Sequence, residues 1–335
     1  MPARIAAFTY VLPETTYTNA DFAADFPEAK LQTLEKIGVQ KRHITPQGKT
    51  SSDLAAEAAE KLFLEQKIDR SSIDFLIYCS FDYDYYLPNT ACVLQHRLGL
   101  STRCGAFDMG LGCSAYVYGI ATAISLLETM QLKNVLLLTA SSLTHKIHPQ
   151  DRGNRFLFGD AASATLISFS EKKQTGPFTF GTDGGGADQI IVPHGGMRNP
   201  INETSFINQT DEFGNVTNPA SFYMDGFGIF RFTVATVPAL IEETLQKAGI
   251  TKDDIDLYVF HQPNVFLNEL LRKKLTIPEE KFVHCMKDFG NTVQATIPIA
   301  LTEALKEGKL KPGMKVLLAG FGVGLSWACG IIDYE

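Results

Sequence analysis

The stretch from Phe107 to Tyr116 reads FDMGLGCSAY and contains a point at which a strand gives way to a helix. Small residues around Cys113 open a helical pattern that continues to about Met130, and an apolar run follows at 135–139. An apolar run that succeeds a 3.6-residue periodicity is typical of a buried strand after a helix. The stretch therefore predicts a strand, a helix and a second strand, with Cys113 at the first junction.

The same succession recurs in the second half of the chain. A small-residue opening at Gly290-Asn291-Thr292 begins a helix to about Lys306, and a strand follows at 316–319. Another helix-to-strand pair is also duplicated, with helices at 52–66 and 232–248 and strands at 75–79 and 257–260. Apolar strands separated by helices indicate sheets covered on both faces. We predict an α/β protein of two similar halves, although βα alternation alone also produces some similarity of this kind.

A loop-rich segment separates the two halves. Residues 176–218 contain many Gly, Asn, Thr and Pro residues, which are typical of turns and loops. A connection of this length in a compact protein is often functional, so the segment is either a pocket lid or a plain surface excursion. We predict an N-terminal half at 1–170, a connecting or lid region at 171–228 and a C-terminal half at 229–335.

The composition argues against several classes of function. The 335 residues carry a formal net charge of -7, whereas nucleic-acid binding needs dense basic surfaces. The N-terminus has no apolar run of signal-peptide length, and the uncharged run 316–332 is short for a membrane span and broken by glycines. Six cysteines without a CxxC pair indicate neither a zinc site nor a redox motif. We expect a cytoplasmic protein with reduced thiols, no metal, no nucleic-acid partner and no membrane span.

Cys113 is the first candidate for chemistry. At the start of a helix, backbone N–H groups and the positive end of the helix dipole favour a thiolate, and the small neighbours leave room for a substrate. A buried core thiol is the alternative, because free cysteine is among the most buried residue types. The sequence therefore predicts a reactive thiolate only if other polar groups accompany it.

Two further polar residues occupy matching junctions. His261 directly follows the strand at 257–260, and the carboxyl ends of strands in α/β sheets are where ligands bind. Asn291 opens a helix at the position that the internal duplication aligns roughly with Cys113. A structural histidine and a helix N-cap are the alternatives. Because the junctions are symmetric, we expect the three side chains to converge where the halves meet.

Seven segments of the chain follow the order of one known family. They are Ile37 to Ile44, Pro88 to Cys92, the Cys113 segment, Phe158 to Ala162, His261 to Asn264, Gly290 to Thr292 and Gly320 to Trp327. These segments resemble the ketoacyl-ACP synthase III family of the thiolase superfamily over nearly the whole chain. The resemblance implies a thiolase-like fold, in which two duplicated halves form a five-layered αβαβα body, and a homodimer.

The resemblance also implies a two-stage reaction. Cys113 takes an acyl group from a coenzyme A or phosphopantetheine thioester, with backbone N–H groups near Cys113 and in the segment that includes Gly322 and Gly324 as the oxyanion hole. His261 and Asn291 then hold the carbonyl of malonyl-ACP while carbon dioxide is lost and a carbon–carbon bond forms. Neutral imidazole and carboxamide N–H groups suit a developing enolate oxygen. An acyl carrier protein is the implied partner, and no permanently bound cofactor is implied.

Some positions depart from the family's pattern. Gln32 stands where the family commonly has a Trp that stacks on the adenine of coenzyme A, whereas the phosphate-side arginine is matched by Arg152. Phe266 replaces a basic residue used for carrier contact, although Lys273 and Lys274 follow, next to Arg272. The segment Tyr83 to Leu87, which shapes the acyl pocket in this family, is rich in aromatic residues. The acyl primer, its donor and the pathway therefore stay open.

Three other functions compete with condensation. A Rossmann oxidoreductase would explain Gly320-Phe321-Gly322-Val323-Gly324, but too few residues follow for the helix and second strand that this motif needs. An acyltransferase on the same fold would pass the acyl group from Cys113 to an alcohol or amine without forming a carbon–carbon bond. A non-catalytic partner subunit would only bind acyl carriers, which the complete set of Cys113, His261 and Asn291 argues against.

Overall fold

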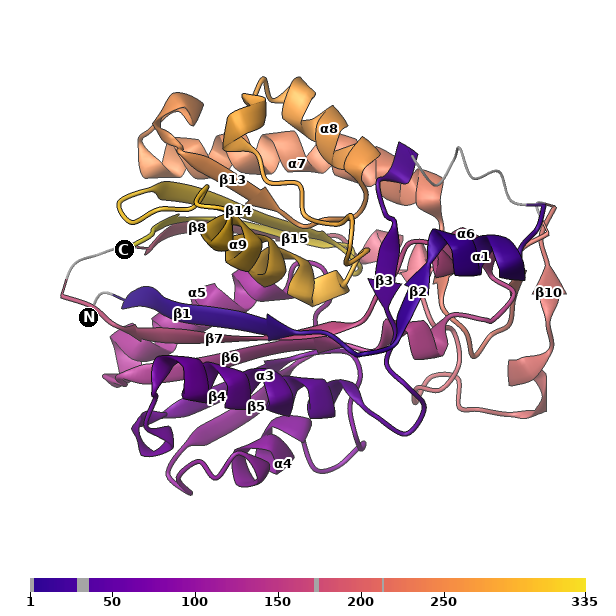
Figure 1. The fold of residues 1–335 in the computed structure, drawn as a ribbon, viewed down its shortest axis with the longest axis horizontal. Helices are drawn as coiled ribbons and strands as arrows, with labels where there is room; N and C mark the ends of the chain where they lie inside the picture. Colours follow the sequence, from indigo (N-terminus) through magenta and orange to yellow (C-terminus); the bar gives the residue numbers. More distant parts are fainter. Residues whose placement is uncertain (1–2, 29–35, 172–174, 213) are drawn as a thin grey trace.

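The computed structural model describes residues 3–28, 36–171, 175–212 and 214–335. Two β-sheets, one from each half of the chain, form its centre (Figure 1). In the first sheet the order is β1-β7-β6-β4-β5, and β6, β4 and β5 are parallel while β1, β7 and β6 alternate in direction. Its strands are β1 (Ala3–Val11), β7 (Ala161–Phe169), β6 (Asn134–Ser141), β4 (Phe75–Cys79) and β5 (Gly105–Met109).

The second sheet repeats this arrangement in the order β13-β14-β15-β8. Here β13 and β14 are parallel, whereas β14, β15 and β8 alternate in direction. Its strands are β13 (Leu257–Phe260), β14 (Lys315–Gly322), β15 (Ser326–Asp333) and β8 (Thr175–Thr182). Starting from β8, the neighbours and directions match those of β1, β7, β6 and β4 in the first sheet. The predicted duplication of the chain is therefore confirmed.

Three pairs of helices complete a five-layered body (Figure 1). α3 and α4 cover the outer face of the first sheet, α7 and α8 cover the outer face of the second, and α5 and α9 lie between the sheets. Their bounds are α3 (Ser51–Gln66), α4 (Thr90–Arg97), α5 (Ala115–Met130), α7 (Gly226–Ala248), α8 (Val265–Lys274) and α9 (Thr296–Lys306). The predicted αβαβα architecture is confirmed.

The amino-acid pattern of each helix fits its layer. In α9, every residue from Thr296 to Thr302 is buried, as expected for a helix enclosed between two sheets. In α3, by contrast, Leu54, Leu62 and Phe63 are buried against the first sheet while Glu57 and Glu65 face solvent. A helix that covers only one sheet needs a single apolar face. The difference places the largest apolar cluster between the sheets, around α5 and α9.

The other elements are short and lie near one edge of the body. They are β2 (Thr16–Thr18), α1 (Asn19–Asp25), β3 (Lys41–His43), α6 (Arg152–Arg155), β9 (Ile190–Ile191), β10 (Gln209–Thr210), β11 (Val216–Thr217) and β12 (Tyr223–Met224). Within the described part of the chain, no helix combines the length and the apolar character that a membrane crossing requires.

Some predicted boundaries shift in the structure. α7 begins at Gly226 rather than near residue 232, because the Asp225 carboxylate accepts hydrogen bonds from the N–H groups of Phe227 and Gly228. α9 begins later than predicted, because a 3-10 turn at Val293–Ala295 precedes it. β8 falls inside the predicted connecting region 171–228 but pairs with β15, so the irregular stretch starts only after β8.

Candidate active site

A cavity of about 570 Å³ lies where the two halves meet. Cys113, His261 and Asn291 all line it, together with mostly apolar side chains from both halves. Each of the three comes from a different loop, after β5, after β13 and before α9. The predicted convergence of these side chains is therefore seen in the structure.

Cys113 lies at the entrance to α5 and packs closely against the second half. A Cβ atom at Gly322 would come within 2.7 Å of the Cys113 Sγ, so this position needs glycine for the approach. Burial raises the pKa of the Cys113 thiol to about 11, against the opposing effect of the N–H groups of Val323 and Cys113 itself. The expected thiolate is therefore wrong for the resting protein, because removal from water outweighs these backbone dipoles.

His261 is buried and held by two hydrogen bonds. Its backbone N–H donates to the carbonyl of Ala319 at 2.7 Å, and its Nδ1 lies 2.8 Å from Thr296 Oγ1. The Thr296 hydroxyl donates to the Val293 carbonyl at 3.0 Å, which leaves its oxygen to accept from Nδ1–H. Burial lowers the pKa of His261 to about 3. The ring is therefore neutral, as expected, but these bonds favour a proton on Nδ1 and a lone pair on Nε2.

Asn291 is held by its own loop. Its Oδ1 accepts from the N–H of Val293 at 2.9 Å, and its backbone N–H donates to the carbonyl of Leu157 at 2.9 Å. Val293 has a φ of 53°, a left-handed conformation that is uncommon outside glycine. Because Oδ1 is occupied, the Nδ2 amino group is the end available to a bound molecule.

Comparisons with known proteins agree with this geometry. Residues 107–184 match the family 3-oxoacyl-[acyl-carrier-protein (ACP)] synthase III, and residues 245–334 match its C-terminal part. The β-ketoacyl-[acyl-carrier-protein] synthase III of Caldanaerobacter subterraneus is 32% identical over 97% of this chain and 95% of its own. The chain belongs to the 3-oxoacyl-ACP synthase III family.

Solved structures support the same membership. A crystal structure of a 3-oxoacyl-(acyl-carrier-protein) synthase III is 42% identical, with a TM-score of 0.98 over the whole of both chains. A 3-oxoacyl-(acyl-carrier protein) synthase from Burkholderia xenovorans is 35% identical, with a TM-score of 0.92 over 100% of this chain and 95% of that one. Both matches cover the two halves of this synthase III, so the halves that enclose the cavity have the same fold as in these solved structures.

The residues predicted to bind coenzyme A are only partly placed at the cavity. Gly322 lines it beside Cys113, whereas Gly324 does not. Arg152 lies in α6, outside the cavity wall, and its Nη1 is 3.1 Å from Glu28 Oε1. Gln32 lies outside the described residues. The charge of Arg152 is thus already partly matched by Glu28, and its other N–H groups are the ones that a phosphate would use.

Two of the three cations predicted to contact a carrier protein are engaged within the protein. Arg272 donates to both carboxylate oxygens of Glu269 at 2.8 Å, so its charge is already matched. Lys274 donates to the backbone carbonyl of Val234, and Lys273 lies 3.8 Å from Glu269 with most of its side chain exposed. Phe266 lines the cavity and stacks near Phe230. Of Arg272, Lys273 and Lys274, Lys273 is thus the cation most accessible to a partner of this synthase III.

Several residues of the cavity were not singled out from the sequence. Phe81 and Val323 lie against Gly112, next to the thiol, and Thr296 orients the imidazole. Asp82 and Lys146 place charged groups in the same wall. Phe81 and Asp82 lie two and three residues after the predicted strand 75–79, near its carboxyl end, so their place in the chain was an available signal. Lys146 carried no such signal.

Proposed function

We propose that this family member is a condensing enzyme that joins an acyl group to a malonyl unit carried by an acyl carrier protein. The proposal rests on one observation above all: a thiol, a neutral imidazole and a free carboxamide N–H₂ line one cavity at the contact between the halves. Family membership supports condensation over simple acyl transfer to an alcohol or amine. The product would start a fatty acid or a specialised acyl chain.

The first step would load Cys113. Its sulfur attacks the carbonyl of an acyl thioester, the carbon–sulfur bond of the donor breaks, and the donor leaves as a thiol. Because Cys113 is protonated at rest, a base must take its proton, and the Nε2 lone pair of His261 is suited to this. That proton ends on the departing thiol. The N–H groups of Cys113 and Val323, which favour negative charge at Sγ, would stabilise the oxyanion.

The second step would form the new bond. The malonyl thioester carbonyl accepts hydrogen bonds from Asn291 Nδ2 and from Nε2–H of His261. For this, the ring gives up its Nδ1 proton to solvent and takes one up on Nε2, and the Thr296 hydroxyl turns from the Val293 carbonyl to donate to Nδ1. Loss of carbon dioxide leaves an enolate, which attacks the acyl carbon and expels the Cys113 thiolate. The thiolate then takes up one proton. A preorganised donor of this kind lowers the barrier by about 3–4 kcal/mol.

Partner and compartment belong to the same proposal. We expect an acyl carrier protein and malonyl thioesters as partners, a homodimer as the working form, and a cytoplasmic location. The donor of the first acyl group is a thioester of coenzyme A or of phosphopantetheine, and no permanently bound cofactor takes part. The names of the related proteins support the acyl carrier protein as a partner; the homodimer and the compartment are part of this proposal.

Variants separate the two steps. Cys113→Ala should retain no acyl group by intact-protein mass spectrometry. Asn291→Ala should load normally, but it should release carbon dioxide from malonyl-ACP at least about 100-fold more slowly than the wild type. The reason is that it loses a donor that acts only in the second step. His261→Ala should slow both steps, and His96→Ala, an exposed histidine, serves as the matched control. Undiminished decarboxylation by Asn291→Ala would instead favour acyl transfer without condensation.

A further inference from the structure

Two side chains of opposite charge, Asp82 and Lys146, lie in the wall of the mostly apolar cavity. Asp82 follows β4 and Lys146 ends the 3-10 turn Leu143–Lys146 after β6, and both belong to the cavity wall that includes Cys113. Charged groups are costly beside apolar surface unless something pairs with them. No ion pair joins the two within the described residues, and Lys146 Nζ has no hydrogen-bond partner there. Lys146 is exposed, so water also reaches it, and both groups remain able to contact a molecule bound in the cavity.

Asp82 is held in place by hydrogen bonds to both neighbouring strand ends. Its Oδ2 accepts from the N–H of Ser142 at 2.8 Å, and its own N–H donates to Ser80 Oγ at 3.0 Å. Burial raises the pKa of Asp82, while the Ser142 N–H and the charge of Lys146 act in the opposite direction. The second oxygen, Oδ1, has no hydrogen-bond partner among the described residues, so one side of a fixed carboxyl group is available.

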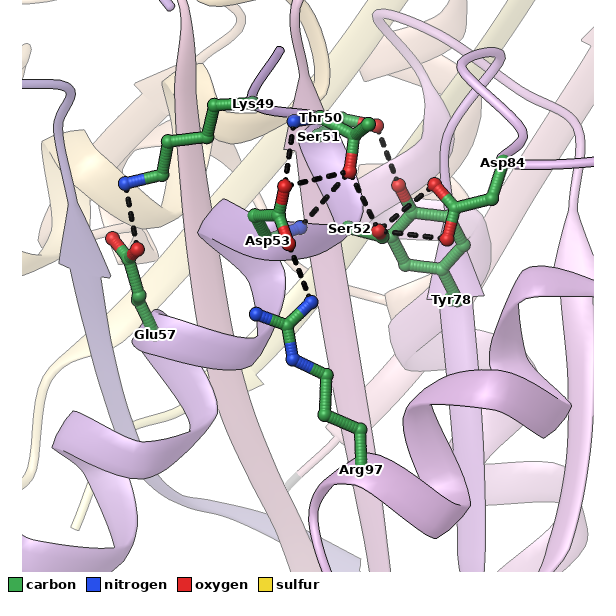
Figure 2. Close-up of polar contacts among 9 residues, drawn as sticks. All are labelled: Lys49, Thr50, Ser51, Ser52, Asp53, Glu57, Tyr78, Asp84 and Arg97. Atoms are coloured by element: carbon green, nitrogen blue, oxygen red, sulfur yellow. Dashed lines mark hydrogen bonds and ion pairs between the residues drawn. The ribbon is translucent and has the colours of Figure 1, made fainter.

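The loop that carries Asp82 is anchored on the start of α3. Figure 2 shows Ser52 Oγ directed at both oxygens of Asp84, at 2.9 and 2.8 Å, and Ser51 Oγ at 2.7 Å from Tyr78 OH. Ser51 Oγ also donates to the backbone carbonyl of Asp82 at 3.0 Å. A group held by several partners in this way is preorganised for binding rather than a mobile surface charge.

Asp82 is next in the chain to a residue that lies close to the thiol. The ring of the preceding residue, Phe81, lies so close to Gly112 that a Cβ atom there would be 2.8 Å from Phe81 Cε2. Cys113 follows Gly112 directly. An acyl chain on Cys113 that extends along Phe81 would therefore bring its far end toward Asp82.

The chemistry of the pair selects one kind of ligand. A carboxylate on the acyl chain would be attracted by Lys146 but repelled by Asp82. An ammonium group would be attracted by Asp82 but repelled by Lys146. A hydroxyl group can donate to Asp82 and accept from Lys146 at the same time. Building on the proposed function, we propose that the preferred primer is an acyl chain with a hydroxyl group at its far end, held by Asp82 and Lys146. A plain alkyl chain would displace water from Asp82 without replacing its hydrogen bond and would offer no partner to Lys146, which favours the hydroxylated substrate.

The test measures loading of Cys113 from N-acetylcysteamine thioesters, which need no carrier. Straight chains of four, six and eight carbons are compared with the same chains bearing a terminal hydroxyl, carboxylate or amino group. We expect loading of the hydroxylated chain to be at least about tenfold faster than that of the plain chain at one length. Asp82→Asn keeps an acceptor for Ser142, and Lys146→Met keeps the length of the side chain. Each should remove most of this preference, whereas Lys311→Met, an exposed control, should not.

The outcomes distinguish this inference from the proposed function. Faster loading of plain, carboxylated or aminated chains at every length would overturn the hydroxyl preference while leaving the condensing activity intact. The same holds if Asp82→Asn and Lys146→Met retain the full preference. Failure of every thioester to load Cys113 would overturn the proposed function and the primer together.

Discussion

At Cys113, burial and backbone hydrogen bonds act on the thiol in opposite directions. The N–H groups of Cys113 and Val323 favour the thiolate, but burial dominates and raises the pKa to about 11. A protonated thiol can rest beside apolar groups without the cost of a buried charge. Activation therefore depends on His261 and on a bound acyl donor rather than on a thiolate present beforehand.

This protonation state predicts the pH dependence of alkylation. Since only the thiolate reacts, iodoacetamide should modify Cys113 slowly at pH 7, and the rate should rise about tenfold per pH unit up to about pH 10. Cys113 is 8% exposed, whereas Cys92 is exposed and should be modified first at pH 7. Peptide mass spectrometry after timed quenching measures both rates. A Cys113 that outpaces Cys92 at pH 7 would show that the thiolate is already formed.

At the scale of elements, the start of α3 supports the cavity wall. Thr50 and Asp53 form a capping box at this end of the helix, and the Asp53 carboxylate also pairs with Arg97 of α4 (Figure 2). Ser51 and Ser52 are left to bind the loop that follows β4. The start of α3 thus contributes to the packing of the outer layer and also holds the loop that forms the Asp82 part of the cavity wall.

Removing one of these contacts should loosen the wall. Ser52→Ala deletes a buried hydroxyl that donates to the Asp84 carboxylate, and we expect the free energy of unfolding to fall by about 1.5–3 kcal/mol. The ratio of loading rates between hydroxylated and plain chains should fall as well. Ser71→Ala removes a similar but exposed bond to Asp69 and should change neither quantity much. Urea unfolding and the loading assay provide the two measurements; an unaltered loading ratio would argue against a link between α3 and the cavity.

At the scale of the whole molecule, net charge and local charge oppose each other. The chain carries a formal net charge of -7, so an acidic carrier protein is repelled at long range and must find a local cation. Arg272 is matched by Glu269 and Lys274 donates to the carbonyl of Val234, which leaves Lys273 as the exposed cation near the end of α8 that is least engaged. A single exposed charge contributes modestly and is screened by salt.

Charge reversal at this position tests the carrier contact. Lys273→Glu should raise the KM for malonyl-ACP about threefold to tenfold at low ionic strength, with little change in kcat, because a rim charge acts mainly on association. The effect should shrink at about 0.5 M salt. Lys311→Glu makes the same change in total charge elsewhere and should have a smaller effect. Steady-state kinetics give the KM for malonyl-ACP of both variants. Equal KM values for Lys273→Glu and Lys311→Glu would mean that α8 does not contact the carrier.

The sequence by itself determined the architecture and the three candidate side chains. The strands Phe75–Cys79 and Leu257–Phe260 were predicted to the residue, because each is a short apolar run after a periodic helix. Cys113, His261 and Asn291 stand at junctions that local pattern alone marks, and the duplication of the chain makes those junctions meet. The catalytic roles of the three residues and the division of the chain into three regions stay predictions.

Only the tertiary structure decided the chemical state of the cavity. The protonation of Cys113, the tautomer of His261 and the shared place of Asp82 and Lys146 in one cavity wall depend on how far each group is removed from water and on which distant neighbours surround it. Asp82 and Lys146 lie far apart in the sequence, and β8 joins the second sheet from within a predicted connection. Local periodicity records which face of an element is apolar, but desolvation and long-range pairing arise only once the halves pack together.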